Sequence, residues 1–197
     1  MPSIYVERGI IMGYSTYTNS GVQMITTTID QKNVLIQFFY TTLTLVGMVL
    51  LPIIVHLIPF SGAYPLGAYL LPMFIAPLVA AFYVSPVGLF LAGLLAPIIN
   101  NLLTGMPQPP MLYFVTGELI VFSILVFWIV QKEKTFLGFS ALAFLVAKLA
   151  IMVPQILILN GGFDLSVLGQ YLNGLAISIP GILILFAVER LLLRRQQ

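Results

Sequence analysis

Cysteine is absent from the 197-residue sequence, and histidine occurs only once, at position 56. Without cysteine, the chain has no disulfide, no thiolate metal site and no cysteine nucleophile. A single histidine disfavours a zinc site built on histidines. The sequence also lacks the GxxxxGK[ST] loop of many ATPases, the HExxH motif of zinc proteases and the GxSxG motif of serine hydrolases. A membrane enzyme is therefore a weak hypothesis, and no cofactor is predicted.

Charge is the second scarcity. Only 7% of the residues are charged, with eight Lys and Arg against six Asp and Glu, whereas a soluble domain carries about a quarter charged residues. The net charge of +2 is spread along the chain, so nothing indicates a surface for nucleic acid.

Hydrophobic residues are what the sequence has in abundance: they make up 60% of it, and the mean hydropathy is +1.08. A helix of about 20 mainly apolar residues is long enough to cross a bilayer. Six such stretches are predicted, near 34–58, 65–83, 86–103, 111–131, 136–159 and 165–190. We therefore expect an all-α membrane protein, with a bundle of six transmembrane helices forming one domain over residues 34–197.

The first 33 residues are expected to form a cytoplasmic or interfacial N-terminal segment. Glu7 and Arg8 interrupt its start, and no continuous apolar core follows, so it does not resemble a signal peptide. Cationic residues near spans tend to stay in the cytoplasm. Seven of the eight fall on one side of the six predicted spans, namely Arg8, Lys32, Lys132, Lys134, Arg190, Arg194 and Arg195. This distribution predicts that both termini are cytoplasmic.

Two ionisable residues, Glu118 and Lys148, lie inside the predicted spans, where an unpaired charge is costly. Counted at about 1.5 Å per residue, Glu118 lies roughly 10 Å and Lys148 roughly 16 Å below the outer surface, so their side chains can meet. Weaker polar groups gather in the same half of the membrane, whereas the cytoplasmic halves of the last three spans contain little beyond isolated serines. The candidate ligand contacts, including those on the side of a lid, are Glu118, Lys148, Gln155, Gln170, Asn173, Asn100, Asn101 and Tyr113.

This outward polarity has two interpretations. In the first, Glu118 and Lys148 form a buried ion pair, and the amides hold helices together. In the second, the groups line a ligand pocket open to the outside, in which Lys148 holds an anionic or carbonyl group and Glu118 holds a donor. His56, near the outer end of the first span, is interpreted as a wet interfacial residue.

Proline and small residues pattern the remaining spans. Prolines inside predicted spans indicate kinks, since proline removes a backbone donor; they are Pro52, Pro72, Pro77, Pro97, Pro154 and Pro180. Small residues recur at four-residue spacing in the second and third spans, at Ala76, Ala80, Gly88, Ala92 and Ala96. Such a stripe allows a helix to approach closely, either within the fold or from another membrane protein.

The stretch 63–107 combines a short turn after the second span, a "G...G...AP" pattern and a "TGMP" outer loop, at Gly88, Gly93, Ala96, Pro97, Thr104, Gly105, Met106 and Pro107. With these motifs the stretch resembles the substrate-binding S component of energy-coupling factor (ECF) vitamin transporters. More loosely, the resemblance covers residues 34–190. The first span lacks the AxxxA docking motif of some members, so the small-residue stripes would take that role.

The resemblance implies a receptor in the cell membrane of a prokaryote. The last three spans and the outer loop after the first would bind a vitamin or related micronutrient. The first three spans would bind a transmembrane coupling subunit, which two cytoplasmic ATPase subunits drive. The alternative is a structural or scaffold membrane protein, similar to a cell-shape factor, in which the polar cluster only holds helices together.

Overall fold

A computed structural model describes residues 31–62, 64–132, 136–160 and 165–194. The chain divides into two units, Met1–Asp30 and Gln31–Gln197, and only the second contains described residues. The predicted N-terminal segment, 1–33, therefore lies outside the described residues except at its last three positions.

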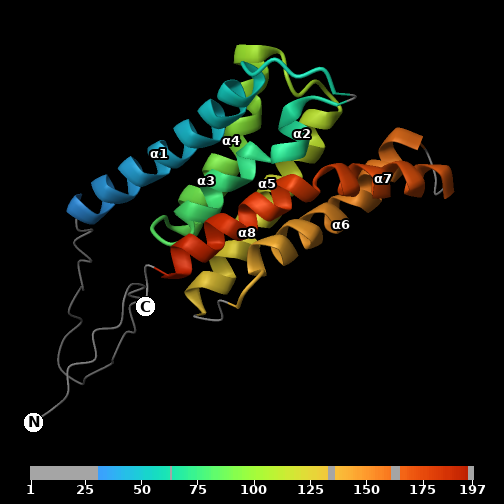
Figure 1. Cartoon of the computed structure of the whole chain (residues 1–197). Coiled ribbons are helices and arrows are strands. Elements are labelled where there is room, and N and C mark those ends of the chain that lie inside the picture. The colour runs from blue at the N-terminus through green and yellow to red at the C-terminus, as the bar shows by residue number, and fades with distance from the viewer. Residues whose placement is uncertain (1–30, 63, 133–135, 161–164, 195–197) are drawn as a thin grey trace, which may run out of the picture. The chain divides into compact units, whose positions relative to one another are not determined.

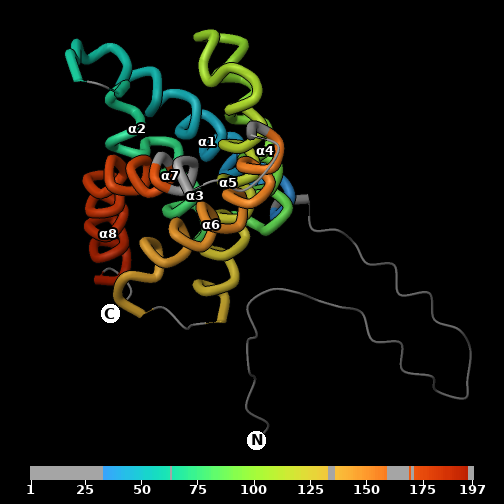
Figure 2. The backbone as a smooth tube through the Cα atoms, turned by 90° about the vertical axis from the view of Figure 1, so that its right-hand side faces the viewer, coloured from blue at the N-terminus to red at the C-terminus, as the bar shows by residue number. Residues whose placement is uncertain are grey.

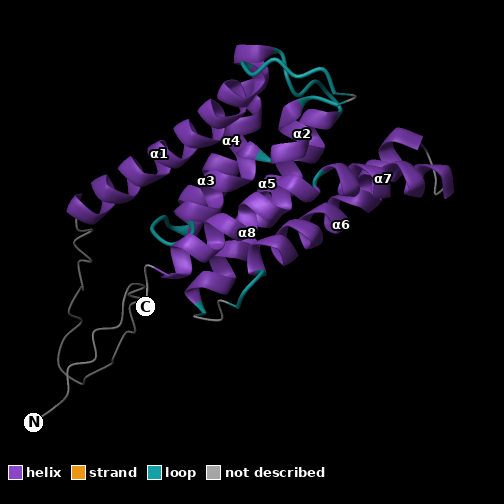
Figure 3. Ribbon diagram, in the orientation of Figure 1, coloured by secondary structure: helices purple, strands orange, loops and turns teal. Residues whose placement is uncertain are grey.

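The described residues form helices and no strands (Figure 3). Helices predominate because a backbone in lipid must satisfy its hydrogen bonds internally. In chain order they are α1 (Gln31–His56), α2 (Leu66–Leu70), α3 (Pro72–Ala80), α4 (Pro86–Thr104), α5 (Met111–Gln131), α6 (Phe139–Asn160), α7 (Leu165–Ile177) and α8 (Ile179–Arg194).

Four of the described helices, α1, α4, α5 and α6, are long and apolar enough to cross a membrane. The pair α7 and α8, bent by 49°, makes a fifth candidate span. The predicted span 65–83 instead holds α2 and α3, a shorter apolar stretch with a break. The chain is thus an all-helical protein with four or five candidate spans, while the sixth span and the orientation stay predictions.

The break between α2 and α3 lies at Leu71, whose backbone is left-handed with φ 51° and ψ 45°. Pro72 follows, and its ring is suited to the first position of α3 but not to continuing α2. Gly181 of α8 packs against this break, since a Cβ atom built there would lie 2.8 Å from the carbonyl oxygen of Tyr69. The missing side chain at Gly181 therefore lets α8 approach the broken backbone.

The second break separates α7 from α8 at Ser178. Pro180, the second residue of α8, has no backbone N–H and clashes with the preceding turn, which accounts for the bend. The Ser178 hydroxyl donates to the carbonyl of Gly174 at 3.0 Å, and its backbone N–H donates to that of Leu175 at 3.0 Å. Through these bonds Ser178 holds the last turn of α7.

The centre of the bundle is an aromatic cluster from three helices. Phe74 of α3 meets Phe122 of α5 and Phe144 of α6 edge to face, with ring centroids 5.1 Å apart in both pairs. Phe122 and Phe144 are fully buried. Large apolar side chains such as Phe38 and Phe39 of α1 are exposed instead, as expected of a helix that faces lipid.

Helix α1 lies along α3 and α4 (Figure 1, and turned by 90° in Figure 2). The predicted small-residue stripes take part in this packing: a Cβ atom at Gly88 would collide with Thr41, and one at Gly47 would lie 3.3 Å from Ala76. Also buried are Ala80, Ala92 and Ala96. The stripes therefore serve packing inside the chain, which is one of the two alternatives that the sequence left open. Their role in docking a partner stays a prediction.

Most helices of this unit begin or finish at one of two opposite ends of the bundle (Figure 1). At one end α3, α5 and α8 finish and α4 and α6 begin; it carries Lys132, Arg190 and Arg194, and we call it the basic end. The loops that follow α1 and α4 lie at the opposite end.

Candidate functional site

A cavity of about 870 Å³ lies toward the loops that follow α1 and α4. Its walls come from α1 to α7, from two loops and from the α7–α8 break. Pockets for small molecules commonly measure about 300–1,000 Å³. Both helix breaks reach it, through Leu71 and Ser178. Non-helical backbone is tolerated at membrane depth where it is buried in protein or lines a cavity. The position of the two breaks at the cavity therefore explains why they are tolerated.

The lining is mostly apolar with a minority of polar side chains. Aromatic and thioether groups include Phe74, Phe114 and Met73. The polar lining residues are His56, Tyr64, Asn100, Thr104, Glu118, Lys148, Gln155, Tyr171, Asn173 and Ser178. This mixture suits an amphiphilic small molecule. No group of three or more metal-ligating side chains occurs among the described residues, so the cavity offers hydrogen bonds and an ion pair.

The ion pair joins Lys148 of α6 to Glu118 of α5. The Lys148 Nζ atom lies 2.8 Å from each carboxylate oxygen of Glu118. The Glu118 side chain is 3% exposed and that of Lys148 is 24% exposed, so Lys148 is the more exposed member of the pair. The predicted meeting of these two side chains is confirmed. An ammonium has three N–H donors, and this geometry leaves donor capacity for a ligand.

Tyr171 of α7 contacts the backbone of Lys148, because its hydroxyl donates to the Lys148 carbonyl. It thereby joins α7 to α6 beside the ion pair and lines the cavity. The sequence analysis missed Tyr171. Its only signal was its place beside the polar positions Gln170 and Asn173, and a tyrosine in an apolar run is easily counted as hydrophobic.

His56 at the end of α1 also lines the cavity. Its Nδ1 atom lies 2.6 Å from the carbonyl oxygen of Pro52. Because a carbonyl only accepts, Nδ1 is the donor, and in the neutral form of an imidazole with this tautomer Nε2 is an acceptor. The sequence placed His56 at the membrane interface, and the structure adds it to the candidate contacts.

Asn100 of α4 lines the cavity and also donates a hydrogen bond to the backbone of α1. Pro52 lacks the N–H that would bond to the carbonyl of Met48, and the Asn100 side-chain amide donates to that carbonyl instead at 3.3 Å. The same amide donates to the carbonyl of Ala96 at 3.2 Å. Asn100 thus couples a proline kink to the cavity wall.

Two further predicted contacts reach the cavity. Gln155 lines it and points its amide at the sulfur of Met111, 3.9 Å away. Asn173 lines it and donates to the hydroxyl of Tyr64 at 3.3 Å, which links α7 to the loop after α1.

Two predicted contacts, Asn101 and Tyr113, are not brought to the cavity. Asn101 is not in the lining, and its amide donates to the carbonyl of Pro107 at 2.8 Å, where it holds the loop after α4. Tyr113 is 67% exposed and also lies outside the lining, because Phe114 and Glu118 occupy the inner face of α5. Gln170 lies in α7, but its side chain is outside the part of the chain that the structure describes.

A buried carboxylate at the basic end was also missed. Glu189 of α8 is fully buried and accepts hydrogen bonds from the backbone N–H of Gly138 at 2.6 Å and of Ser140 at 2.8 Å. It also accepts from the Ser140 hydroxyl at 2.6 Å. These donors lie at the start of α6, so the carboxylate of one helix caps another. Glu189 lies beside Arg190 at the end of the predicted span 165–190, and no role is predicted for it from the sequence.

No family model, curated protein or solved structure matches the chain.

Proposed function

We propose that the chain is the substrate-binding subunit of a membrane importer, and that it resembles the S component of an ECF transporter. In this proposal the cavity binds a vitamin or related micronutrient of amphiphilic character. A transmembrane coupling subunit and two cytoplasmic ATPase subunits then move the bound molecule inward across the cell membrane of a prokaryote. The sequence has no Walker motif of its own, which is in keeping with energy supplied by partners.

One observation carries the proposal: the partly exposed Lys148 lines a cavity of about 870 Å³ into which two helix breaks also open. The scaffold alternative needs the Lys148–Glu118 pair but no space beside it. Helices held together by polar groups pack most tightly when the space between them is filled. A large cavity next to the pair therefore favours ligand binding over the alternative that the polar groups only hold helices together.

The polar lining suggests how a ligand is held. Lys148 offers donors to an anionic or carbonyl group, while Glu118 keeps the ammonium in place and accepts from a donor of the ligand. His56 of α1 also lines the cavity, and in the neutral form of its ring Nε2 offers an acceptor. A molecule with an acceptor at one end, a donor at the other and an apolar body matches these groups.

The test is retention of a small molecule during purification. The full chain is purified in mild detergent and denatured, and the released molecules are identified by mass spectrometry. We expect wild type to release a specific compound and the double variant Lys148→Met/Glu118→Leu to release none. The double change removes both charges together, so it avoids leaving one of them buried without a partner.

Arg194→Met is the matched control, because it removes an exposed cation at the basic end, away from the cavity. It should retain the compound at the wild-type level. If wild type releases no specific compound, the scaffold alternative gains and the receptor is wrong. The need for partners is tested in vesicles: the chain alone should bind the compound without accumulating it against a gradient.

A further inference from the structure

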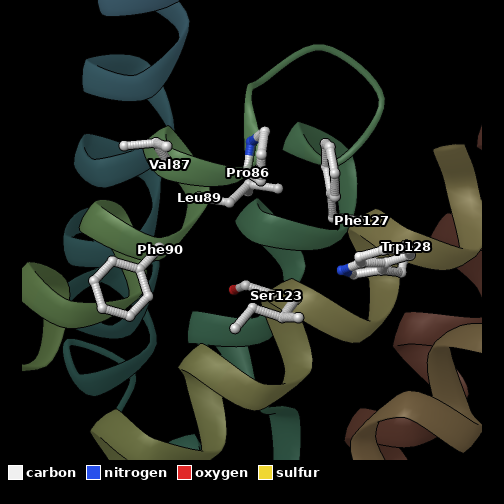
Figure 4. A pocket seen from close by; sticks show the side chains of 8 residues that line it. Pro86, Val87, Leu89, Phe90, Ser123, Phe127 and Trp128 are labelled. Carbon is white, nitrogen blue, oxygen red and sulfur yellow. The ribbon is translucent and has the colours of Figure 1, made fainter. Parts of the chain in front are cut away.

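A second cavity, of about 310 Å³, is lined by residues of α4 and α5 (Figure 4). It is lined by Pro86, Val87, Leu89, Phe90, Ser123, Ile124, Phe127 and Trp128. None of these residues lines the first cavity. Because α4 begins and α5 ends here, it lies near the basic end, and we call it the basic-end groove. Val87 is 66% and Trp128 55% exposed, so the groove is open at the protein surface.

The rim of the groove carries positive charge. The Lys132 Nζ atom lies 4.7 Å from the centroid of the Trp128 ring. No described residue accepts a hydrogen bond from the indole N–H, and Figure 4 shows the indole nitrogen on the side that faces Ser123. α4 also begins here, but Pro86 has no N–H and the Gly88 N–H donates to the Ser85 side chain, so the positive charge of the rim comes from Lys132. An ammonium and a free N–H donor together favour an anion.

The floor of the groove is apolar and hollow. Leu89, Phe90 and Phe127 form its walls, and the small side chain of Ser123 leaves the space between them. The Ser123 hydroxyl is the buried side-chain polar atom that lacks a partner in the described part of the chain. Ser123 lies nine residues before Lys132, about 13 Å along the helix. With Lys132 at the membrane surface, this floor lies at the depth of acyl chains.

We propose that the basic-end groove binds an anionic phospholipid, with its phosphate beside Lys132 and the Trp128 N–H and one acyl chain over the floor. A positive rim above an apolar floor repeats the order of headgroup and chain in a lipid. A partner helix fits less well, since helices approach closely over small residues, whereas Val87, Phe90 and Trp128 on this rim are bulky.

Trp128 is the only tryptophan of the chain, so its fluorescence reports on this groove alone. The full chain is reconstituted in phosphatidylcholine vesicles that contain the same fraction of either brominated phosphatidylglycerol or brominated phosphatidylcholine. Quenching is normalised to vesicles without bromine. We expect the anionic lipid to quench Trp128 severalfold more than the zwitterionic one. In Lys132→Gln, quenching by the two lipids should become nearly equal. Arg194→Gln removes another exposed cation of the basic end and should leave the difference in quenching unchanged.

Equal quenching of wild type by both lipids overturns the proposal. Trp128 shielded from both lipids alike also overturns it, and assigns the groove to a helix of a second copy of the chain. Ser123→Leu provides a test that leaves the rim unchanged, because its larger side chain fills the floor. Reduced quenching by the anionic lipid in this variant supports the site, and unchanged quenching contradicts it.

Discussion

At the scale of single residues, the main feature is that the two buried carboxylates among the described residues each have donors close by. Glu118 has Lys148, and the three groups around Glu189 satisfy its carboxylate. A buried charge that loses its partner is strongly destabilising, whereas replacing both charges by apolar groups is often neutral. The ion pair is therefore needed for stability only in the sense that neither charge can be left alone.

The first prediction separates stability from binding at this pair. Lys148→Met leaves the Glu118 carboxylate buried and unpaired, and should cost about 3–5 kcal/mol of unfolding free energy. Adding Glu118→Leu should recover most of that loss but not ligand retention. Unfolding of each variant in detergent measures the effect. A double variant as unstable as Lys148→Met alone would contradict the account.

The second prediction concerns the carbonyl of Met48, which Pro52 leaves without its usual partner. Asn100→Leu removes the donor and should cost about 1–3 kcal/mol, the penalty for a buried unsatisfied group. Pro52→Ala restores a backbone N–H for that carbonyl, so Asn100→Leu should cost clearly less in this background. A double-mutant cycle of unfolding free energies measures the coupling. Additive effects would show that the two residues do not share the carbonyl.

At the scale of helices, the first turn of α8 packs on the break between α2 and α3, because Gly181 lies against the backbone of Tyr69 and Leu70. The predicted spans 86–103 and 111–131 agree closely with α4 and α5, since their apolar runs are bounded by proline and by polar residues. The predicted span 65–83 is wrong as a single helix. Hydropathy counts side chains and does not register a left-handed backbone at Leu71.

The third prediction tests this contact between α8 and the break at Leu71. Gly181→Ala places a Cβ atom 2.8 Å from the Tyr69 carbonyl oxygen and 2.9 Å from the carbonyl carbon of Leu70. Both are backbone atoms that cannot move aside, so we expect a loss of about 1–3 kcal/mol and weaker ligand retention. Gly169→Ala in α7 is the matched control, because no described atom lies within 4 Å of its Cβ position. It should be neutral or stabilising. Equal effects of both changes would remove the role of the contact.

At the scale of the whole molecule, polarity is unevenly distributed between the two ends. The polar lining lies toward the loops after α1 and α4, while the buried carboxylate at the basic end is fully satisfied and fully covered. The sequence predicted this asymmetry, because the depth of Glu118 and Lys148 follows from counting residues along two helices. It did not predict Tyr171 or Asn100 as supports, because their partners are backbone carbonyls that only the folded chain brings near.

The fourth prediction concerns the number of spans and their orientation. The absence of cysteine makes any single introduced cysteine a specific label site. Ser61→Cys and Gln108→Cys, in the loops after α1 and α4, should react with a membrane-impermeant maleimide added to intact cells. Lys132→Cys at the basic end should react only after the membrane is permeabilised. Labelling of Lys132→Cys in intact cells would reverse the orientation, and labelling of only one of the two loops would contradict the six spans.

The central claim is that the cavity between the helix breaks contains a small molecule, and the mass of the intact protein tests it most directly. Native mass spectrometry of wild type released from detergent should show the chain with one bound small molecule. Ala68→Phe, which places a ring in the cavity from α2, should show the bare chain. A wild-type protein observed only at the mass of the bare chain, or a bound molecule that persists unchanged in Ala68→Phe, would contradict the account.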